Sequence, residues 1–178
     1  MSYITTYTGR HIDPLSPKKD KLLIEDAAHS LSLLCRGNGH VKTFFSVGQH
    51  CINCCREALA RGYSRRVALA CLVHDASEAY MSDVPRPFKK ELPQYVRAEE
   101  KLLDMIYEKF LGKSLSAEEK SLVRQVDDTM LYYDMLELLG EKVADTAPDI
   151  KIELSYRVRP FEEVEREFLD LYHELAEE

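Results

Sequence analysis

The sequence predicts an all-α fold, a helical bundle of about six helices preceded by at most a short N-terminal hairpin. Apolar residues recur at intervals of three and four through most of the chain, which is the spacing of one helix face. Capping residues and glycines bracket these stretches. We expect residues 1–178 to form a single domain, because a chain of 178 residues can build one sizeable core.

Each expected helix has its own start or stop signal. Ser64 is a predicted N-cap, and Ser116 with Glu119 matches a capping box. Two prolines predict a loop at 83–87, and residues 141–160 look irregular apart from a candidate short strand at 151–154. The predicted helices cover 20–34, 46–60, 65–78, 96–111, 116–139 and 161–175.

Composition excludes several classes of function. The formal net charge of −7 argues against a general nucleic-acid binder. No apolar stretch approaches the ~20 residues of a membrane span, and the N-terminus has no signal-like segment. The chain has five cysteines, an odd number, and three of them crowd residues 51–55. We therefore expect a cytoplasmic protein with reduced thiols.

Cys51 and Cys54 form a Cys-x-x-Cys pair, with Cys55 adjacent. A zinc site would need a second pair or histidines at suitable spacing, and neither is evident in the sequence. A redox motif would need a preceding strand, whereas this context is helical. We interpret these cysteines as small buried apolar side chains.

The adjacent pair His74-Asp75 follows an apolar run and offers two ligands for a divalent metal. A buried carboxylate without a partner is costly, so Asp75 needs a reason to be there. His50 lies within a helix predicted to be buried, and Asp127 lies among apolar residues in the middle of another. Helical spacing places Glu78 on the same face as His74.

Two imidazoles and two carboxylates suit a borderline divalent metal, and this ligand set tolerates Mn²⁺, Co²⁺, Fe²⁺, Zn²⁺ or Mg²⁺. Asp127 and Asp128 are adjacent, so the fourth ligand is ambiguous from sequence. We prefer Asp127 because Val123, Asp134 and Leu138 continue its face of the helix, and Asp128 stays an alternative.

The order His50, His74-Asp75, Asp127 resembles the HD-domain metal-dependent phosphohydrolases, over roughly residues 24 to 140. Residues 46–50, Ser-Val-Gly-Gln-His, look like the segment around that superfamily's first histidine. Residues 74–78 followed by 83–87 are similar to the branch of YfbR-like 5′-nucleotidases.

The resemblance implies that Glu78 and Asp83 serve catalysis and that Arg36 contacts the substrate phosphate. It also implies one divalent metal ion per chain, because binuclear members have further histidines and none lies between His74 and His173. Lower-ranking candidates near the phosphate or the metal are His40, Lys42, Arg86 and Asp128.

The function expected from the resemblance is hydrolysis of a phosphate ester on a nucleotide, with a (deoxy)nucleoside 5′-monophosphate first. A dNTP triphosphohydrolase and an alarmone pyrophosphohydrolase are alternatives, although the latter carries Glu-Asp where this chain has Glu78-Ala79. A non-catalytic, metal- and nucleotide-binding regulatory module is the alternative of another class. Apolar helix faces and tyrosines are compatible with a homodimer or higher homo-oligomer.

Overall fold

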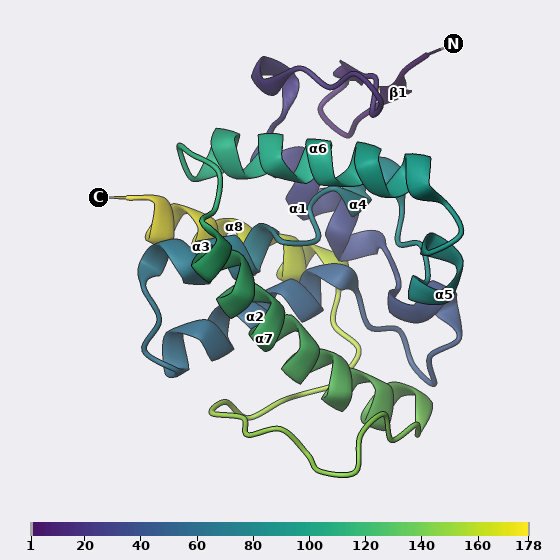
Figure 1. Cartoon of the computed structure of the whole chain (residues 1–178), viewed down its shortest axis with the longest axis vertical. Coiled ribbons are helices and arrows are strands. Elements are labelled where there is room, and N and C mark those ends of the chain that lie inside the picture. The colour runs from purple at the N-terminus through teal and green to yellow at the C-terminus, as the bar shows by residue number, and fades with distance from the viewer. Residues whose placement is uncertain (1, 178) are drawn as a thin grey trace.

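Helices dominate the computed structural model of this chain, which describes residues 2–177, and the predicted all-α class is confirmed (Figure 1). The one small sheet pairs β1 with β2, antiparallel, in the expected hairpin. In chain order the elements are β1 (Ile4–Thr5), β2 (His11–Ile12), η1 (Lys19–Lys21), α1 (Ile24–Leu33), η2 (Arg36–Gly39), α2 (Val47–Ala60), α3 (Arg65–Val73), α4 (Glu78–Met81), α5 (Arg86–Lys89), α6 (Pro93–Phe110), α7 (Ala117–Asp134), η3 (Met135–Leu139) and α8 (Phe161–Ala176).

Several helix ends match the sequence signals. Ser46 and Ser116 each close a capping box, in which the serine hydroxyl accepts from the third residue's amide and that residue's side chain bonds back. Ser64 accepts from the amide of Val67 at the start of α3. Gly140 follows η3 with φ +72°, a conformation that favours glycine, so the predicted stop lies where expected.

The predicted helix 65–78 is confirmed to Val73 and wrong after it. Helix α3 ends at Val73, and residues 74–77 form turns before α4 begins at Glu78. The amides of Ala76 and Glu78 donate to carbonyls three residues back, at 3.0 and 2.9 Å, rather than four. This tighter winding places about three residues in a turn, so His74 and Glu78 do not share a face by α-helical spacing.

Four other predictions also need correction. The helix predicted over 20–34 begins only at Ile24, because Leu22 and Leu23 are extended after the short η1. The segment 83–87 is not loop throughout, because α5 begins at Arg86, and a proline is tolerated in the first turn of a helix. Residues 151–154 form no strand, within a stretch 141–160 that is otherwise irregular as predicted. Helix α6 begins at Pro93, earlier than the predicted 96, for the same reason that α5 accepts its proline.

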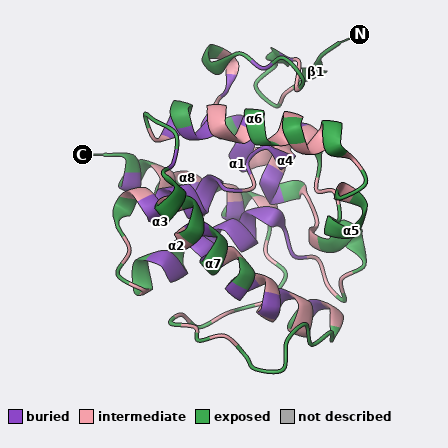
Figure 2. Ribbon diagram, viewed as in Figure 1, coloured by how far each residue is buried: buried purple, intermediate pink, exposed green. Residues whose placement is uncertain are grey.

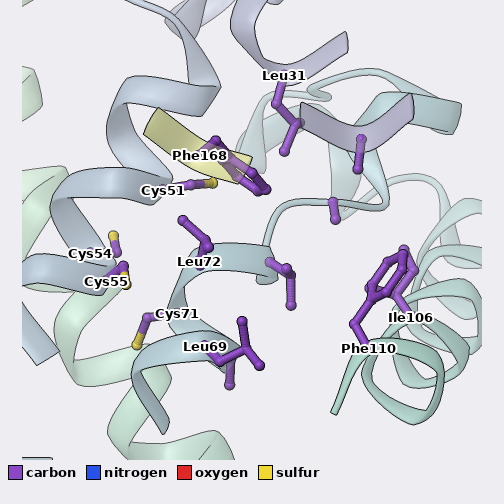
Figure 3. Packing of buried hydrophobic residues seen from close by; sticks show 14 of the residues in the cluster. Leu31, Cys51, Cys54, Cys55, Leu69, Cys71, Leu72, Ile106, Phe110 and Phe168 are labelled. Carbon is purple, nitrogen blue, oxygen red and sulfur yellow. The ribbon is translucent and has the colours of Figure 1, made fainter. Parts of the chain in front are cut away.

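The core lies where α2 and α3 pack against each other, with α1 and α8 covering one side and α7 crossing α2 and α3 (Figures 1 and 2). Leu31, Leu72 and Phe168 fill its centre and are fully buried (Figure 3). Cysteines from α2 and α3 line the same interface as free thiols. Among residues 2–177, no helix has the length and apolar character that crossing a membrane requires.

Gly48 lies on α2 close to both α1 and α8. A Cβ atom there would lie 3.1 Å from Val164 Cγ1 and 3.2 Å from the backbone carbonyl of Leu31. We expect Gly48→Ala to lower the free energy of unfolding by up to about 2 kcal/mol, since overpacking costs about 1–3 and better helix propensity returns about 1. Urea unfolding measures this, with Asn53→Ala on the same helix as control. A stabilised Gly48→Ala protein would contradict the close packing.

Glu57 anchors the irregular segment to α2. Its carboxylate, fully buried, accepts from the backbone amides of Lys151 and Ile152 at 3.0–3.2 Å and from Arg61 Nε at 2.7 Å. Arg61 also donates to the carbonyl of Asp149. The buried charge is therefore paired and hydrogen-bonded, which is the condition for tolerating it in a core.

Candidate metal centre

Two histidines and two aspartates from separate elements converge on one point. His50 comes from the first turn of α2, His74-Asp75 from the turn after α3, and Asp127 from α7. Asp127 Oδ1 lies 3.2 Å from His50 Nε2 and 3.6 Å from His74 Nε2. Asp75 lies 3.3 Å from His74 Nε2 through Oδ1 and 3.8 Å from His50 Nε2 through Oδ2. The four residues predicted as ligands are thus brought together.

The other ring nitrogen of each histidine is held by an acceptor. His50 Nδ1 lies 2.8 Å from Asp134 Oδ2, and His74 Nδ1 lies 2.8 Å from the carbonyl oxygen of Cys71. Since a carbonyl can only accept, we assign the proton of neutral His74 to Nδ1. Both Nε2 lone pairs are then directed at the aspartates, which is the arrangement that second-shell acceptors impose on metal-binding imidazoles.

The carboxylates of Asp75 and Asp127 alter the pKa values at this point, as do the imidazoles they face. Burial acts to lower the pKa of His74, but the Asp75 carboxylate, together with Cys51 and Asp127, more than reverses this and raises the pKa well above its usual value. Burial likewise acts to raise the pKa of Asp127, yet its bond to His50 and the nearby imidazole of His74 hold it well below the usual range. The aspartates therefore stabilise positive charge between them, whether a proton or a metal ion carries it.

The residues present fit a divalent metal ion. His74 Nε2 and Glu78 Oε2 are buried and lack a hydrogen-bond partner among the described residues. Buried polar atoms are nearly always paired in proteins, so such an orphan needs a ligand or water to explain it. Asp75 and Asp127 keep 18% and 22% of their side-chain surface exposed, so solvent reaches the site from their side.

Arg36 lies beside the centre, in η2. Its Nη1 is 3.5 Å from Asp75 Oδ2 and its Nη2 is 3.6 Å from Asp134 Oδ2. Burial would lower the pKa of this guanidinium, but the charges of Asp134 and Asp75 raise it, so Arg36 stays charged. A fixed cation at this place can hold an anionic group of a ligand.

Glu78 opens α4 and is buried. Burial, together with the negative charges of Asp75 and Asp83, raises the pKa of its carboxyl well above the usual value. Asp83 lies in the following loop and is half-buried. An acid with a raised pKa next to a candidate metal site is typical of proton-transfer groups.

Of the two adjacent aspartates, Asp127 faces the histidines, whereas Asp128 is about half exposed and pairs with Arg86 at 3.3 Å. Arg86 also donates to Asp127 Oδ2 at 3.1 Å, so it borders the centre. His40 is exposed, and Lys42 bonds to the backbone of Leu138 and Glu137. The two bonds of Lys42 join the loop after η2 to η3. Within residues 2–177, neither His40 nor Lys42 forms a hydrogen bond or ion pair with the four candidate ligands.

A cavity of about 480 Å³ adjoins the centre at His74 and Asp127, between α6 and α7. Its wall combines apolar side chains with charged ones, namely Leu103, Tyr107, Val123, Glu100, Asp104, Lys120 and Arg124. A second cavity of about 610 Å³, lined by Arg61, Tyr132 and Lys151, is larger but includes none of the four ligands. We consider the smaller one the relevant site, because convergent polar groups mark function better than volume does.

Sequence reasoning missed two residues of the centre. Asp134 bonds His50, lies near Arg36 and accepts from the hydroxyl of Tyr156 at 3.1 Å. Its position seven residues after Asp127 on one helix face was the available signal. Cys54, interpreted as a core residue, has its Sγ 3.5 Å from His50 Nε2. Its spacing of four after His50 indicated that contact.

Replacing Asp134 tests its role as a support for His50. We expect Asp134→Ala to weaken divalent-metal affinity about 10- to 100-fold, because the His50 ring loses the acceptor that orients it. Calorimetric metal titration measures this. Tyr156→Phe removes only the bond to Oδ1 and is the matched control, expected to bind within about threefold of wild type. Equal affinity for Asp134→Ala and wild type would contradict the assignment.

One known protein is similar to this chain over almost its whole length. The chain is 30% identical over 182 aligned residues to the uncharacterized protein RCAP_rcc00048 of Rhodobacter capsulatus, covering 94% of this chain and 92% of that protein. This chain belongs to the RCAP_rcc00048 family. The chain is also 42% identical over 110 residues to the uncharacterized protein YfdR of Escherichia coli. That match spans 62% of this chain and 59% of YfdR, less than two thirds of its length.

Partial similarity links this member of the RCAP_rcc00048 family to proteins named as 5′-deoxynucleotidases. The chain is 35% identical over 93 residues to YfbR of Escherichia coli and 33% identical over 93 residues to VV1113 of Vibrio vulnificus. Each match covers 43% of this chain and less than half of the relative. No family model matches the chain.

Proposed function

We propose that this protein is a phosphohydrolase of the HD-domain type that uses one divalent metal ion to hydrolyse a (deoxy)nucleoside 5′-monophosphate. The observation that carries the proposal is the convergence of two Nε2 atoms on two carboxylates, with both Nδ1 atoms already bonded. The partial similarity to YfbR and VV1113 supports the substrate class.

His50, His74, Asp75 and Asp127 would hold the ion, which supplies Lewis acidity when bound, acidifying water and polarising a phosphoryl oxygen. Four protein ligands leave positions open on ions that accept more than four. The exposed faces of Asp75 and Asp127 give solvent and substrate access.

The chain's own residues then divide the work. Arg36 neutralises phosphate charge as it redistributes in the transition state, a role suited to a fixed and permanently charged guanidinium. Glu78 orients the attacking water and takes its proton. Asp83, half-buried in the loop after α4, supplies the proton that the departing ribose oxygen takes up.

The nucleoside part of the substrate fits the cavity between α6 and α7. Its volume of about 480 Å³ lies within the roughly 300–1,000 Å³ usual for small-molecule sites. Tyr107 and the aliphatic side chains of Leu103 and Val123 offer apolar surface for a base, and the cavity reaches His74 and Asp127 where the phosphate must lie.

A panel of nucleotides tests the proposal. The purified full-length protein is incubated with mono- and triphosphates of ribo- and deoxyribonucleosides and with an alarmone, with each of Mn²⁺, Co²⁺, Fe²⁺, Zn²⁺ and Mg²⁺. Release of inorganic phosphate from 5′-monophosphates, abolished by a chelator, is expected. Tripolyphosphate or pyrophosphate as product would replace the monophosphate assignment by a related one. Binding of metal and nucleotide without turnover under any metal would overturn the enzymatic proposal in favour of a regulatory module.

A further inference from the structure

Cys54 borders the candidate metal centre on its buried side. It lies one helical turn after His50 on α2 and is 1% exposed. Its Sγ lies 3.5 Å from His50 Nε2, the same nitrogen that faces Asp127. Ligand atoms of His50, Cys54 and His74 all lie within 4.8 Å of one another. A thiol, two imidazoles and two carboxylates therefore surround the same point.

These separations match those of ligands on a single ion. Zinc binds sulfur at about 2.3 Å and nitrogen at about 2.0–2.1 Å, so neighbouring S and N ligands lie about 3.1–3.6 Å apart at bond angles of about 90–110°. His74 supplies an independent sign, because its Nε2 is more than nine-tenths buried and has no hydrogen-bond partner among residues 2–177. That nitrogen points into the space that Cys54 borders.

The other core cysteines are placed differently. Cys51 Sγ lies 4.0 Å from Nδ1 of His74, which the carbonyl of Cys71 already occupies, so it meets the back of that ring. Cys55 and Cys71 are fully buried in the same interface (Figure 3). Cys54 and Cys51 each belong to a group of converging ligand atoms, whereas Cys55 and Cys71 belong to neither group. Among the cysteines of residues 2–177, Cys54 is thus the one whose sulfur lies next to Nε2 of His50, where Asp127 also lies.

We propose that Cys54 is an inner ligand of the metal centre and biases it towards Zn²⁺, Co²⁺ and Fe²⁺ over Mg²⁺. Thiolates bind these softer ions far better than magnesium, which prefers oxygen. When the ion binds, a sulfur–metal bond forms and the thiol proton passes to solvent. This inference rests on the metal centre of the proposed function, but it names a ligand and a metal preference that the four-residue set does not include.

Cobalt spectroscopy on the full-length protein tests the inference without an activity assay. After removal of metal with a chelator, Co²⁺ is titrated into wild type, Cys54→Ala, Cys54→Ser and Cys55→Ala. Wild type and Cys55→Ala are expected to show visible cobalt bands together with a near-ultraviolet band of sulfur-to-cobalt charge transfer. Both Cys54 variants should lose the near-ultraviolet band, keep the visible bands, and bind Co²⁺ and Zn²⁺ at least about tenfold more weakly.

The outcomes separate the two proposals. Visible bands without any sulfur band in wild type would overturn the role of Cys54 and leave the four-residue centre intact. A sulfur band that survives in Cys54→Ala would also overturn it, because another cysteine would then be the source. Absence of Co²⁺ binding in wild type would overturn both the ligand and the metal centre. Circular dichroism of each variant, matched to wild type, shows that the fold is retained.

Discussion

Asp75→Asn is expected to bind divalent metal more than about 100-fold more weakly than wild type and to lose phosphate release with it. Asp75 reaches the Nε2 atoms of both histidines, at 3.3 and 3.8 Å. The amide keeps the size of the side chain but removes its negative charge, which is what balances a dication and the Arg36 guanidinium. Loss of a supporting residue costs about 10- to 100-fold in affinity, so loss of a ligand should exceed that.

Metal content after dialysis, measured by elemental analysis, and a calorimetric titration report this result directly. Asp145→Asn makes the same chemical change on an exposed residue of the 141–160 segment and should retain wild-type metal content. Stoichiometric metal in Asp75→Asn would remove Asp75 from the ligand set. Two tightly bound ions per wild-type chain would contradict the single-metal proposal.

Glu78→Gln is expected to keep its metal and to lower kcat by about 10²–10⁴. Glu78 begins α4 just beyond the ligands, and its Oε2 is buried without a partner in the described structure. Glutamine preserves the shape of the side chain but can no longer take a proton from water. The loss should therefore fall on kcat, with metal affinity and KM close to wild type.

Steady-state kinetics on the preferred monophosphate, with metal content measured on the same samples, test this. Glu141→Gln, an exposed residue beyond η3, provides the control for the chemical change. An unchanged kcat in Glu78→Gln would exclude Glu78 as the proton-transfer group. A loss of metal in that variant would instead make it a ligand.

The helices could be predicted because periodicity and caps agree locally. The serines at 46, 64 and 116 mark the first turns of α2, α3 and α7, and each signal depends only on residues within one turn. The break after Val73 could not be predicted in this way. No glycine or proline marks it, and His74 and Asp75 in the turn contact His50 of α2 and Asp127 of α7, which lie far away in the sequence.

The candidate ligands could be predicted for a different reason. Histidine and aspartate in apolar helical surroundings are costly, so their positions stood out in the sequence. Asp134 and Cys54 did not stand out, because an aspartate near a helix end and a cysteine in a core are each ordinary. Their importance depends on α2 and α7 lying side by side, and only the fold supplies that contact.

Because Glu57 binds only part of the irregular segment 141–160, protection of its backbone amides from solvent should vary along the segment. The amides of Lys151 and Ile152 bond to a fully buried carboxylate, although no helix or sheet includes them. Residues 142–146 of the same segment are exposed. In deuterated water the amides of Lys151 and Ile152 should exchange slowly and those of 142–146 at once, so one segment would combine core-like and coil-like protection. A single acidic side chain on α2, two turns from His50, thereby protects backbone amides of this segment from exchange, as the hydrogen bonds of a sheet protect those of a strand.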